Sequence, residues 1–227
     1  MRVELVGLPS CGKSTAINKI IEMKKSINNE IVFPINEFTT SKNKIISLVK
    51  KILITFKIVI KNPKKSIYIY RYIYKYIKNK KNSIRFYLYF ITVIDKISSK
   101  TSRAVEIYDE GIIQVLLGLN LISKDSKGIS EFKLLPELLP NKLVFIDIDF
   151  ESFLIRIKER EKKIKSRDGI KIEEKNFSNE ELFQIYNKYN ILKCEIMNLC
   201  NKNEIEYIIL NGKDIDTNEI IKMVMKF

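Results

Sequence analysis

The sequence predicts an α/β fold in which helices cover both faces of a five-stranded parallel sheet, a doubly wound arrangement of three layers. Two observations support this prediction. Short apolar runs bounded by polar or turn residues alternate along the chain with segments of helical periodicity. Near the N-terminus, one such run leads through a glycine-containing loop directly into a helical pattern. At 227 residues, the chain is expected to form one domain, 1–227.

The glycine-containing loop spans residues 7–15 and reads Gly-Leu-Pro-Ser-Cys-Gly-Lys-Ser-Thr. It matches the phosphate-binding pattern G-x-x-x-x-G-K-[ST] at every fixed position, and an expected strand, 3–6, precedes it. The backbone N–H groups of such a loop and the helix N-terminus favour an anion. We expect Lys13 to reach the β- and γ-phosphates of a nucleoside triphosphate and Ser14 to bind Mg²⁺. The residues expected to surround the phosphates are Gly7, Ser10, Cys11, Gly12, Lys13, Ser14 and Thr15.

The other elements follow in order along the chain. Further strands are expected at four apolar runs, 30–35, 104–108, 143–148 and 205–210. Helices are expected after the phosphate loop, after Asp109, and over 151–165, 178–202 and 215–226.

The segment 42–98 alternates Lys with Ile and Tyr, which locally suits a strand. However, Asn62-Pro63 and the polar residues 79–82 divide it into pieces of helix length. We therefore expect a helical insertion of two or three helices. It is expected to cover the side of the nucleotide site where a second molecule, the acceptor of a phosphoryl group, would bind. Its Tyr and Ile side chains are expected to face inward and its Lys side chains to face water.

The composition excludes several kinds of site. The chain has no His, which removes Ser-His-Asp and Cys-His catalysis and His-based metal sites. Its three Cys do not make a disulfide framework, no secretory signal is recognised and no apolar run reaches membrane-spanning length, so we expect a cytoplasmic protein. The net charge of +14 suits an anionic partner, although much of the Lys excess could equally be solvated surface.

A pattern in residues 143–160 suggests a family. The run Leu-Val-Phe-Ile-Asp-Ile-Asp-Phe-Glu is followed by Arg156 and Arg160 in an expected helix. It resembles the thymidylate kinase-like branch of nucleotide and nucleoside kinases, P-loop proteins in which a strand ends in L-D-V-x-P-E before an arginine-bearing lid. The resemblance implies strand order 2-3-1-4-5 and a lid over 156–170. In that lid Arg156, Arg160 and Arg167 would clamp the transferred phosphoryl group.

Three other positions match this family. Asp109-Glu110 ends the expected strand 104–108 where the family carries Asp-Arg or Glu-Arg, and Asp109 could hold Mg²⁺ or accept a hydroxyl proton. A helix N-cap is the alternative role of this pair. Glu37 matches the general base of nucleoside kinases, with an exposed loop residue as the alternative. Gly212 matches a loop that packs near the adenine, and a plain turn would look the same.

The resemblance implies an ATP- and Mg²⁺-dependent small-molecule kinase acting on a nucleotide, a nucleoside or another hydroxyl or phosphate acceptor. Its catalytic residues would be Lys13, Asp109, Arg160, Arg156 and Glu37. Ser14 and Asp109 would hold the metal, and Arg160 and Gly212 would also contact the nucleotide. The alternative is an accessory P-loop NTPase that binds nucleic acid or a partner through 42–98. Contact of 42–98 with an anionic membrane, and a homodimer, are further partners left open.

Overall fold

The computed structural model describes residues 1–24, 31–32, 44–77, 80–99, 105–123, 129, 136–168 and 177–225. Its strands are β1 (Arg2–Val6), β2 (Ile31–Val32), β3 (Val105–Tyr108), β4 (Lys142–Asp147) and β5 (Glu206–Asn211). They pair in parallel in the spatial order β2-β3-β1-β4-β5, with β2 contributing two residues. The predicted α/β class and parallel sheet are confirmed.

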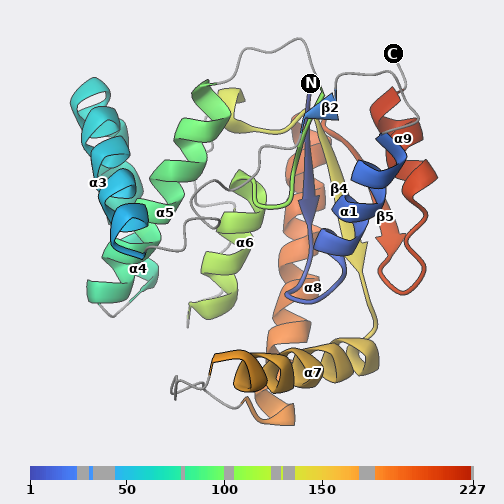
Figure 1. Ribbon diagram of the computed structural model, residues 1–227. Coiled ribbons are helices and arrows are strands. Elements are labelled where there is room, and N and C mark those ends of the chain that lie inside the picture. The colour runs from blue at the N-terminus through green and yellow to red at the C-terminus, as the bar shows by residue number, and fades with distance from the viewer. Residues whose placement is uncertain are drawn as a thin grey trace.

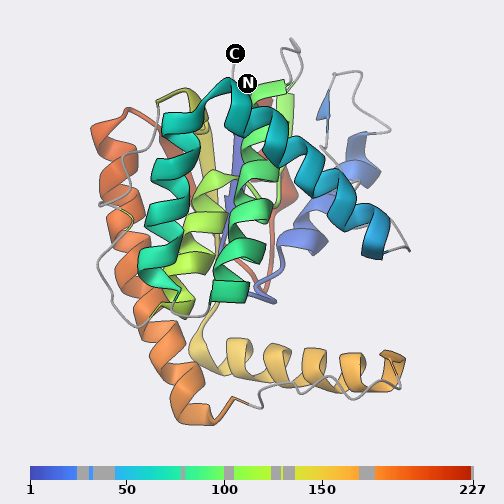
Figure 2. The ribbon, with the colours of Figure 1, turned by 90° about the vertical axis from the view of Figure 1, so that its left-hand side faces the viewer.

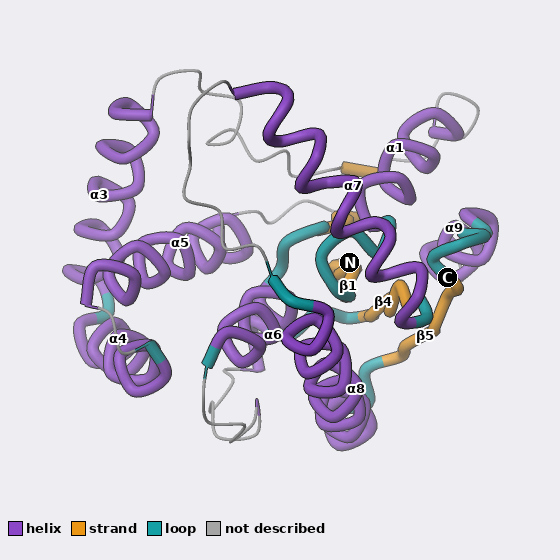
Figure 3. Tube along the Cα trace, turned by 90° about the horizontal axis from the view of Figure 1, so that it is seen from below, coloured by secondary structure: helices purple, strands orange, loops and turns teal. Residues whose placement is uncertain are grey.

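Helices cover both faces of this sheet. On one face lie α1 (Lys13–Lys24) and α9 (Thr217–Met225), and on the other lie α6 (Ile112–Ile122) and α8 (Asn179–Lys202). Helix α7 (Phe150–Asp168) crosses beneath the carboxyl ends of the strands (Figure 1). The view from below looks onto this edge, where the β1–α1 loop also lies (Figure 3). In parallel α/β proteins, ligands bind at this edge of the sheet.

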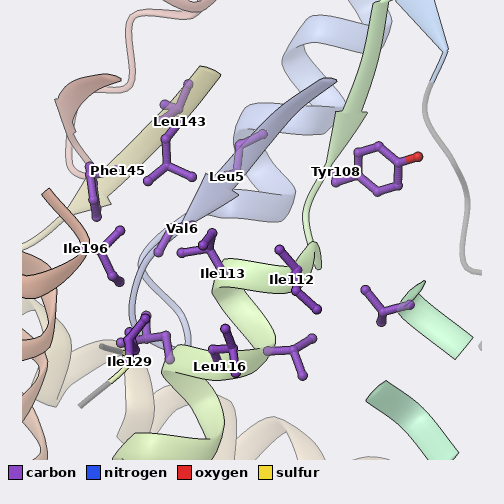
Figure 4. Close-up of a cluster of buried hydrophobic side chains, with 14 of the residues drawn as sticks. Leu5, Val6, Tyr108, Ile112, Ile113, Leu116, Ile129, Leu143, Phe145 and Ile196 are labelled. Atoms are coloured by element: carbon purple, nitrogen blue, oxygen red, sulfur yellow. The ribbon is translucent and has the colours of Figure 1, made fainter. Parts of the chain in front are cut away.

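The core lies around the two central strands, β1 and β4. Leu5, Val6, Leu143 and Phe145 are fully buried, as expected for parallel strands that helices cover on both faces. Apolar side chains of α6 pack against them (Figure 4). Burying one such side chain stabilises the fold by about 1.5–3 kcal/mol, so these strands form a rigid base for the loops at their carboxyl ends.

The segment 42–98 forms three helices in the described residues, α3 (Lys44–Lys61), α4 (Pro63–Tyr76) and α5 (Lys80–Ser99). The break before α4 falls at Asn62, because Pro63 suits the first helical position. Helix α5 packs against α3, α4 and α6, whereas α3 lies on the outside of the molecule (Figure 2).

The expectation that Ile side chains of this segment face inward is wrong for α3. Ile52 and Ile60, for example, are about half exposed or more, because α4 and α5 cover only one side of the helix. The same holds for Ile67 and Tyr74 on α4. Among the helices whose residues are described, none is long and apolar enough to cross a membrane.

Candidate active site

The loop between β1 and α1 has the backbone shape that phosphate binding needs. Ser10 and Gly12 have positive φ angles, of 64° and 117°, so the backbone turns sharply at both residues, as in loops that bind phosphate. The conformation of Gly12 is one that glycine adopts without strain, and a Cβ there would lie 2.9 Å from Cδ1 of Ile215. The amide of Cys11 donates to the carbonyl of Leu8 at 3.2 Å and closes the turn.

Lys13, the first residue of α1, folds back over this loop. Its ammonium group donates to the carbonyls of Gly7 at 2.7 Å and Leu8 at 3.1 Å. Burial lowers the pKa of Lys13, while Cys11 and the carboxylates of Asp109 and Glu110 act in the opposite direction. A partly desolvated cation at the N-terminus of α1 is a favourable place for an anion.

Two cavities meet over the loop. The first, of about 440 Å³, extends from Lys13, Ser14 and Thr15 to the residues that follow β3. The second, of about 420 Å³, lies between α1, α7 and the turn after β5, and Lys19, Lys213 and Ile215 line it. Both are lined by Ser10, Gly12, Thr15 and Arg160. The phosphate loop and Arg160 therefore stand between two chambers, an arrangement that suits two substrates.

The turn after β3 brings two carboxylates into the first cavity. Burial raises the pKa of Asp109 and the neighbouring charge of Glu110 raises it further, while Lys96 and Lys13 oppose these effects. Glu110 accepts a hydrogen bond of 2.5 Å from the hydroxyl of Tyr89, a residue of α5. The helical insertion thus contributes directly to the wall of this cavity.

A second set of contacts fixes this turn to the phosphate loop. The amide of Gly7 donates to Oε1 of Gln114 at 3.0 Å, and the amide of Gln114 donates to Oε1 of Glu4 at 2.6 Å. Glu4 is only 2% exposed, and burial raises its pKa to about 8. Its carboxylate lies against Gly111, where a side chain would collide with it.

These contacts show which group bonds to the backbone amides at the start of α6. The N-cap residue is Gly111, which makes no side-chain cap, and the backbone amides at the start of α6 bond to the carboxylate of Glu4 instead. The alternative role of Asp109-Glu110 as a helix cap therefore does not describe this turn.

Arg156, on α7, joins the phosphate loop to the turn after β5. One guanidinium nitrogen donates to the carbonyls of Cys11 at 2.9 Å and Ser10 at 3.4 Å, and the other donates to that of Gly212 at 3.0 Å. Gly212 lies so close to the carbonyl of Cys11 that a side chain would collide with it. The sequence predicts that Arg156 contacts the transferred phosphoryl group, whereas here its donors bind backbone carbonyls.

The structure brings together Lys13, Ser14, Thr15, Asp109 and Arg160 around the first cavity. Glu37 lies outside the described residues, as does the side chain of Arg167. The acidic residues at the end of β4 have structural partners. Asp147 pairs with Lys193 at 2.5 Å, and Asp149 pairs with Lys213 at 2.7 Å.

Sequence reasoning missed Glu4, Tyr89 and Gln114. Glu4 gave one usable signal, because it is an acidic residue between the apolar residues Val3 and Leu5 of the strand before the loop. Gln114 gave none, since its partner Gly7 is 107 residues away in the chain. Tyr89 is one of several tyrosines in a repetitive segment, and nothing there distinguishes it.

No protein-family model matches the chain, and no curated protein sequence matches it. Solved structures with a similar fold include deoxyadenosine kinase from M. mycoides with bound dCTP, the same enzyme with bound dATP, and the same enzyme with the products dCMP and a flexible dCDP. Each has a TM-score of 0.49, with 12% identity for the first and 14% for the other two. The alignments cover 99% of this chain and 97% of the other. At this identity and TM-score the likeness carries no argument about activity, which must come from the site.

Proposed function

We propose that this protein is a phosphotransferase that moves the terminal phosphoryl group of ATP to a hydroxyl group of a small molecule. One observation carries the proposal: a single cavity joins a phosphate-binding loop to a pair of carboxylates. Lys13 and Ser14 line one side, and Asp109 and Glu110 line the other. Phosphoryl transfer needs groups that stabilise phosphate charge beside a group that accepts a proton, and this cavity offers both.

The second cavity fits the nucleoside part of the donor. Its volume of about 420 Å³ lies in the range of small-molecule sites. It is lined by the aliphatic side chain of Ile215 and by the backbone of Gly212, next to the phosphate loop. A donor held here would direct its triphosphate across the loop toward the carboxylates.

Mg²⁺ fits the oxygen groups of the first cavity. The Ser14 hydroxyl could bind Mg²⁺ directly, and the Asp109 carboxylate could hold it through a water molecule, which would leave Asp109 able to accept a proton. Mg²⁺ prefers oxygen ligands and is commonly held by one or two protein oxygens together with phosphates and water. Within the described residues there is no group of three or more Cys, Asp and Glu that could hold a metal by itself. We therefore propose Mg²⁺ bound together with the nucleotide, where it would neutralise phosphate charge.

The acceptor would occupy the side of the first cavity nearest Asp109. As its hydroxyl oxygen forms a bond to the γ-phosphorus, the hydroxyl proton passes to the Asp109 carboxylate and the bond to the β–γ bridging oxygen breaks, releasing ADP. The burial-raised pKa of Asp109 suits it to receive that proton. Lys13 and Arg160 would stabilise the charge on the transferred group.

The charges of Asp109 and Glu110 also indicate which kind of acceptor this cavity favours. Asp109 and Glu110 would repel an acceptor that already carries a phosphate, whereas a neutral hydroxyl compound meets no such penalty. Among the acceptors left open by the sequence we therefore favour nucleosides and similar alcohols. In this proposal the insertion 42–98 closes the acceptor side through Tyr89, and 156–170 acts as a lid that carries Arg160.

The test is a screen of γ-labelled ATP against nucleosides, nucleoside monophosphates and sugar alcohols. We expect a labelled product in equal amount to ADP with at least one hydroxyl acceptor. Lys13→Ala should lower turnover by about 10²–10³-fold, the usual effect of losing one transition-state contact. Lys202→Ala, an exposed change at the end of α8, is the matched control.

Two results would reject this function. Turnover of Lys13→Ala within about twofold of wild type would remove the phosphate loop from the reaction. ADP release without any labelled acceptor, stimulated by polynucleotide, would instead identify the accessory NTPase that the sequence left open.

A further inference from the structure

Almost all of the net charge of this protein lies in its helical insertion. Residues 44–99 contain fourteen Lys or Arg and one acidic residue, Asp95. The rest of the chain contains 27 basic and 26 acidic residues and is close to neutral. Helices α3 and α4 contain no acidic residue. The positive charge is therefore a local property of one segment of the chain rather than a general property of the sequence.

The first helix of this segment, α3, exposes an apolar face. Six large apolar side chains of α3 are 49–66% exposed. At 3.6 residues per turn they form two adjacent rows along the helix. The residues are Leu48, Ile52, Phe56 and Ile60 in one row and Val49 and Leu53 beside it.

The lysines of α3 lie beside this face. Lys50, Lys57 and Lys61 are exposed and follow one border of the two apolar rows. Thr55, at the opposite border of these rows, is buried. Figure 2 shows α3 along the outside of the molecule, beyond α4 and α5.

We propose that α3 binds an anionic membrane surface, with its apolar rows in the boundary between headgroups and acyl chains and its lysines among the headgroups. An exposed apolar stripe bordered by lysines is the pattern of helices that lie in such an interface. This inference is independent of the phosphotransferase proposal.

Charge and side-chain type favour lipid over the other occupants. A second copy of the chain would bring two strongly basic segments together, and their repulsion opposes association. Single-stranded nucleic acid would suit the lysines but stacks on aromatic rings, and Phe56 is the one aromatic residue in the exposed rows. An anionic bilayer attracts the lysines through its headgroups and buries the aliphatic side chains at the edge of its acyl chains.

The chain has no Trp, so Phe56→Trp introduces a single fluorescent reporter. We expect its emission to shift to the blue with vesicles of phosphatidylcholine and phosphatidylglycerol at low salt, and not with phosphatidylcholine alone. The shift should weaken as salt rises, because the attraction to the surface is screened. Phe183→Trp is the control, since Phe183 is also 49% exposed but lies on α8. Its emission should not change.

Sedimentation with the same vesicles tests the two parts of the surface. Lys50→Gln with Lys57→Gln and Lys61→Gln should weaken binding roughly hundredfold, the effect of three surface lysines. Leu53→Gln with Phe56→Gln should abolish binding, with an unchanged melting temperature. Phe183→Gln with Ile191→Gln makes similar changes on α8, where both side chains are exposed, and should bind as wild type does.

Four outcomes would overturn the proposal. They are no binding to anionic vesicles at low salt, unchanged binding after Leu53→Gln with Phe56→Gln, and a blue shift of the Phe56→Trp reporter with polynucleotide but not with vesicles. The fourth is a concentration-dependent dimer without vesicles that these two changes abolish, because α3 would then be an interface between copies.

Discussion

At the scale of single residues, Asp109 is the group on which the proposed chemistry depends most. Asp109→Asn keeps the shape of the side chain and removes its charge. We expect the chemical step to slow by about 10²–10⁴-fold, the usual contribution of a positioned base, while ATP affinity measured without Mg²⁺ changes little. Single-turnover kinetics measured beside the melting temperature will separate a catalytic role from a structural one.

Asp214→Asn is the matched control, because Asp214 is exposed in the turn after β5. A normal single-turnover rate for Asp109→Asn would remove this residue from the reaction.

Two substitutions of Gln114 separate the effect of its side-chain hydrogen bond from the effect of a charge at this position. Gln114→Leu removes the acceptor for the Gly7 amide, and an unpaired amide of this kind costs about 1–3 kcal/mol. We expect lower stability and a higher KM for ATP. Gln114→Glu keeps an acceptor oxygen but adds a negative charge near Asp109, so stability should be largely kept while kcat falls.

Measured kcat, KM and melting temperature of the two variants test this separation. Gln184→Leu, an exposed change on α8, should leave all three quantities unchanged. Gln114→Leu with wild-type KM and stability would show that the contact with Gly7 contributes nothing.

At the scale of elements, the start of α6 depends on a carboxyl group from β1. The pKa of Glu4 is raised from 4.5 to about 8, so the folded state holds its proton where the unfolded state has lost it. Between these values stability must therefore fall as pH rises, by at most about 1.4 kcal/mol per pH unit for one group.

Glu4→Gln removes this titration and keeps an oxygen for the α6 amides. We expect the melting temperature of the wild type to fall from pH 5 to 8 more steeply than that of Glu4→Gln. Glu22→Gln, an exposed change on α1, should follow the wild type. Parallel curves for wild type and Glu4→Gln would mean that another group titrates.

The two arginines of α7 should respond differently to the same change. Arg156 reaches carbonyls of two separate loops with two nitrogens, which the single ammonium group of Lys cannot do. Arg156→Lys should therefore lower the melting temperature. Arg160 is exposed and lines both cavities, so Arg160→Lys should lower kcat and leave the melting temperature unchanged. If Arg156→Lys instead lowered only kcat and Arg160→Lys only the melting temperature, Arg156 would be the catalytic residue and Arg160 the structural one.

The elements differ in how far the sequence predicted them. Four strands lie within one residue of the predicted runs. The reason is plainest at β4, where buried consecutive apolar side chains are what a parallel strand covered on both faces needs. The loop 7–15 was recognisable because its glycines are required by local geometry, as at Gly12. The orientation of α3 was not predictable. Its apolar residues occupy most of its circumference, and periodicity does not tell which row faces the body.

Of the candidate site, only residues that belong to a short sequence motif or directly follow an expected strand were predictable. Lys13 and Ser14 follow from the loop motif, and Asp109 follows from the end of an expected strand next to that loop. The contacts of Gln114 with Gly7 and of Arg156 with Cys11 join segments more than 100 residues apart, so no local sequence pattern predicts them.

At the scale of the whole molecule, the proposed nucleotide site touches every layer of the fold. The two cavities are built from the β1–α1 loop, α1, the turn after β3, α6, α7 and the turn after β5. A ligand that binds across these elements stabilises the folded state as a unit, because the unfolded chain cannot bind it. Nucleotide binding is therefore measurable as global stability.

We expect ATP with Mg²⁺ at about 100 times its Kd to add about 2.7 kcal/mol, which raises the melting temperature of a chain of this size by about 5–10 °C. EDTA should reduce the increase, since Ser14 and Asp109 would hold the metal only together with the nucleotide. Lys13→Ala should abolish most of it while the protein without nucleotide melts normally. The same measurement with GTP in place of ATP tests which base the 420 Å³ cavity prefers. An unchanged melting temperature with every triphosphate would mean that this loop, despite its sequence and geometry, does not bind nucleotides.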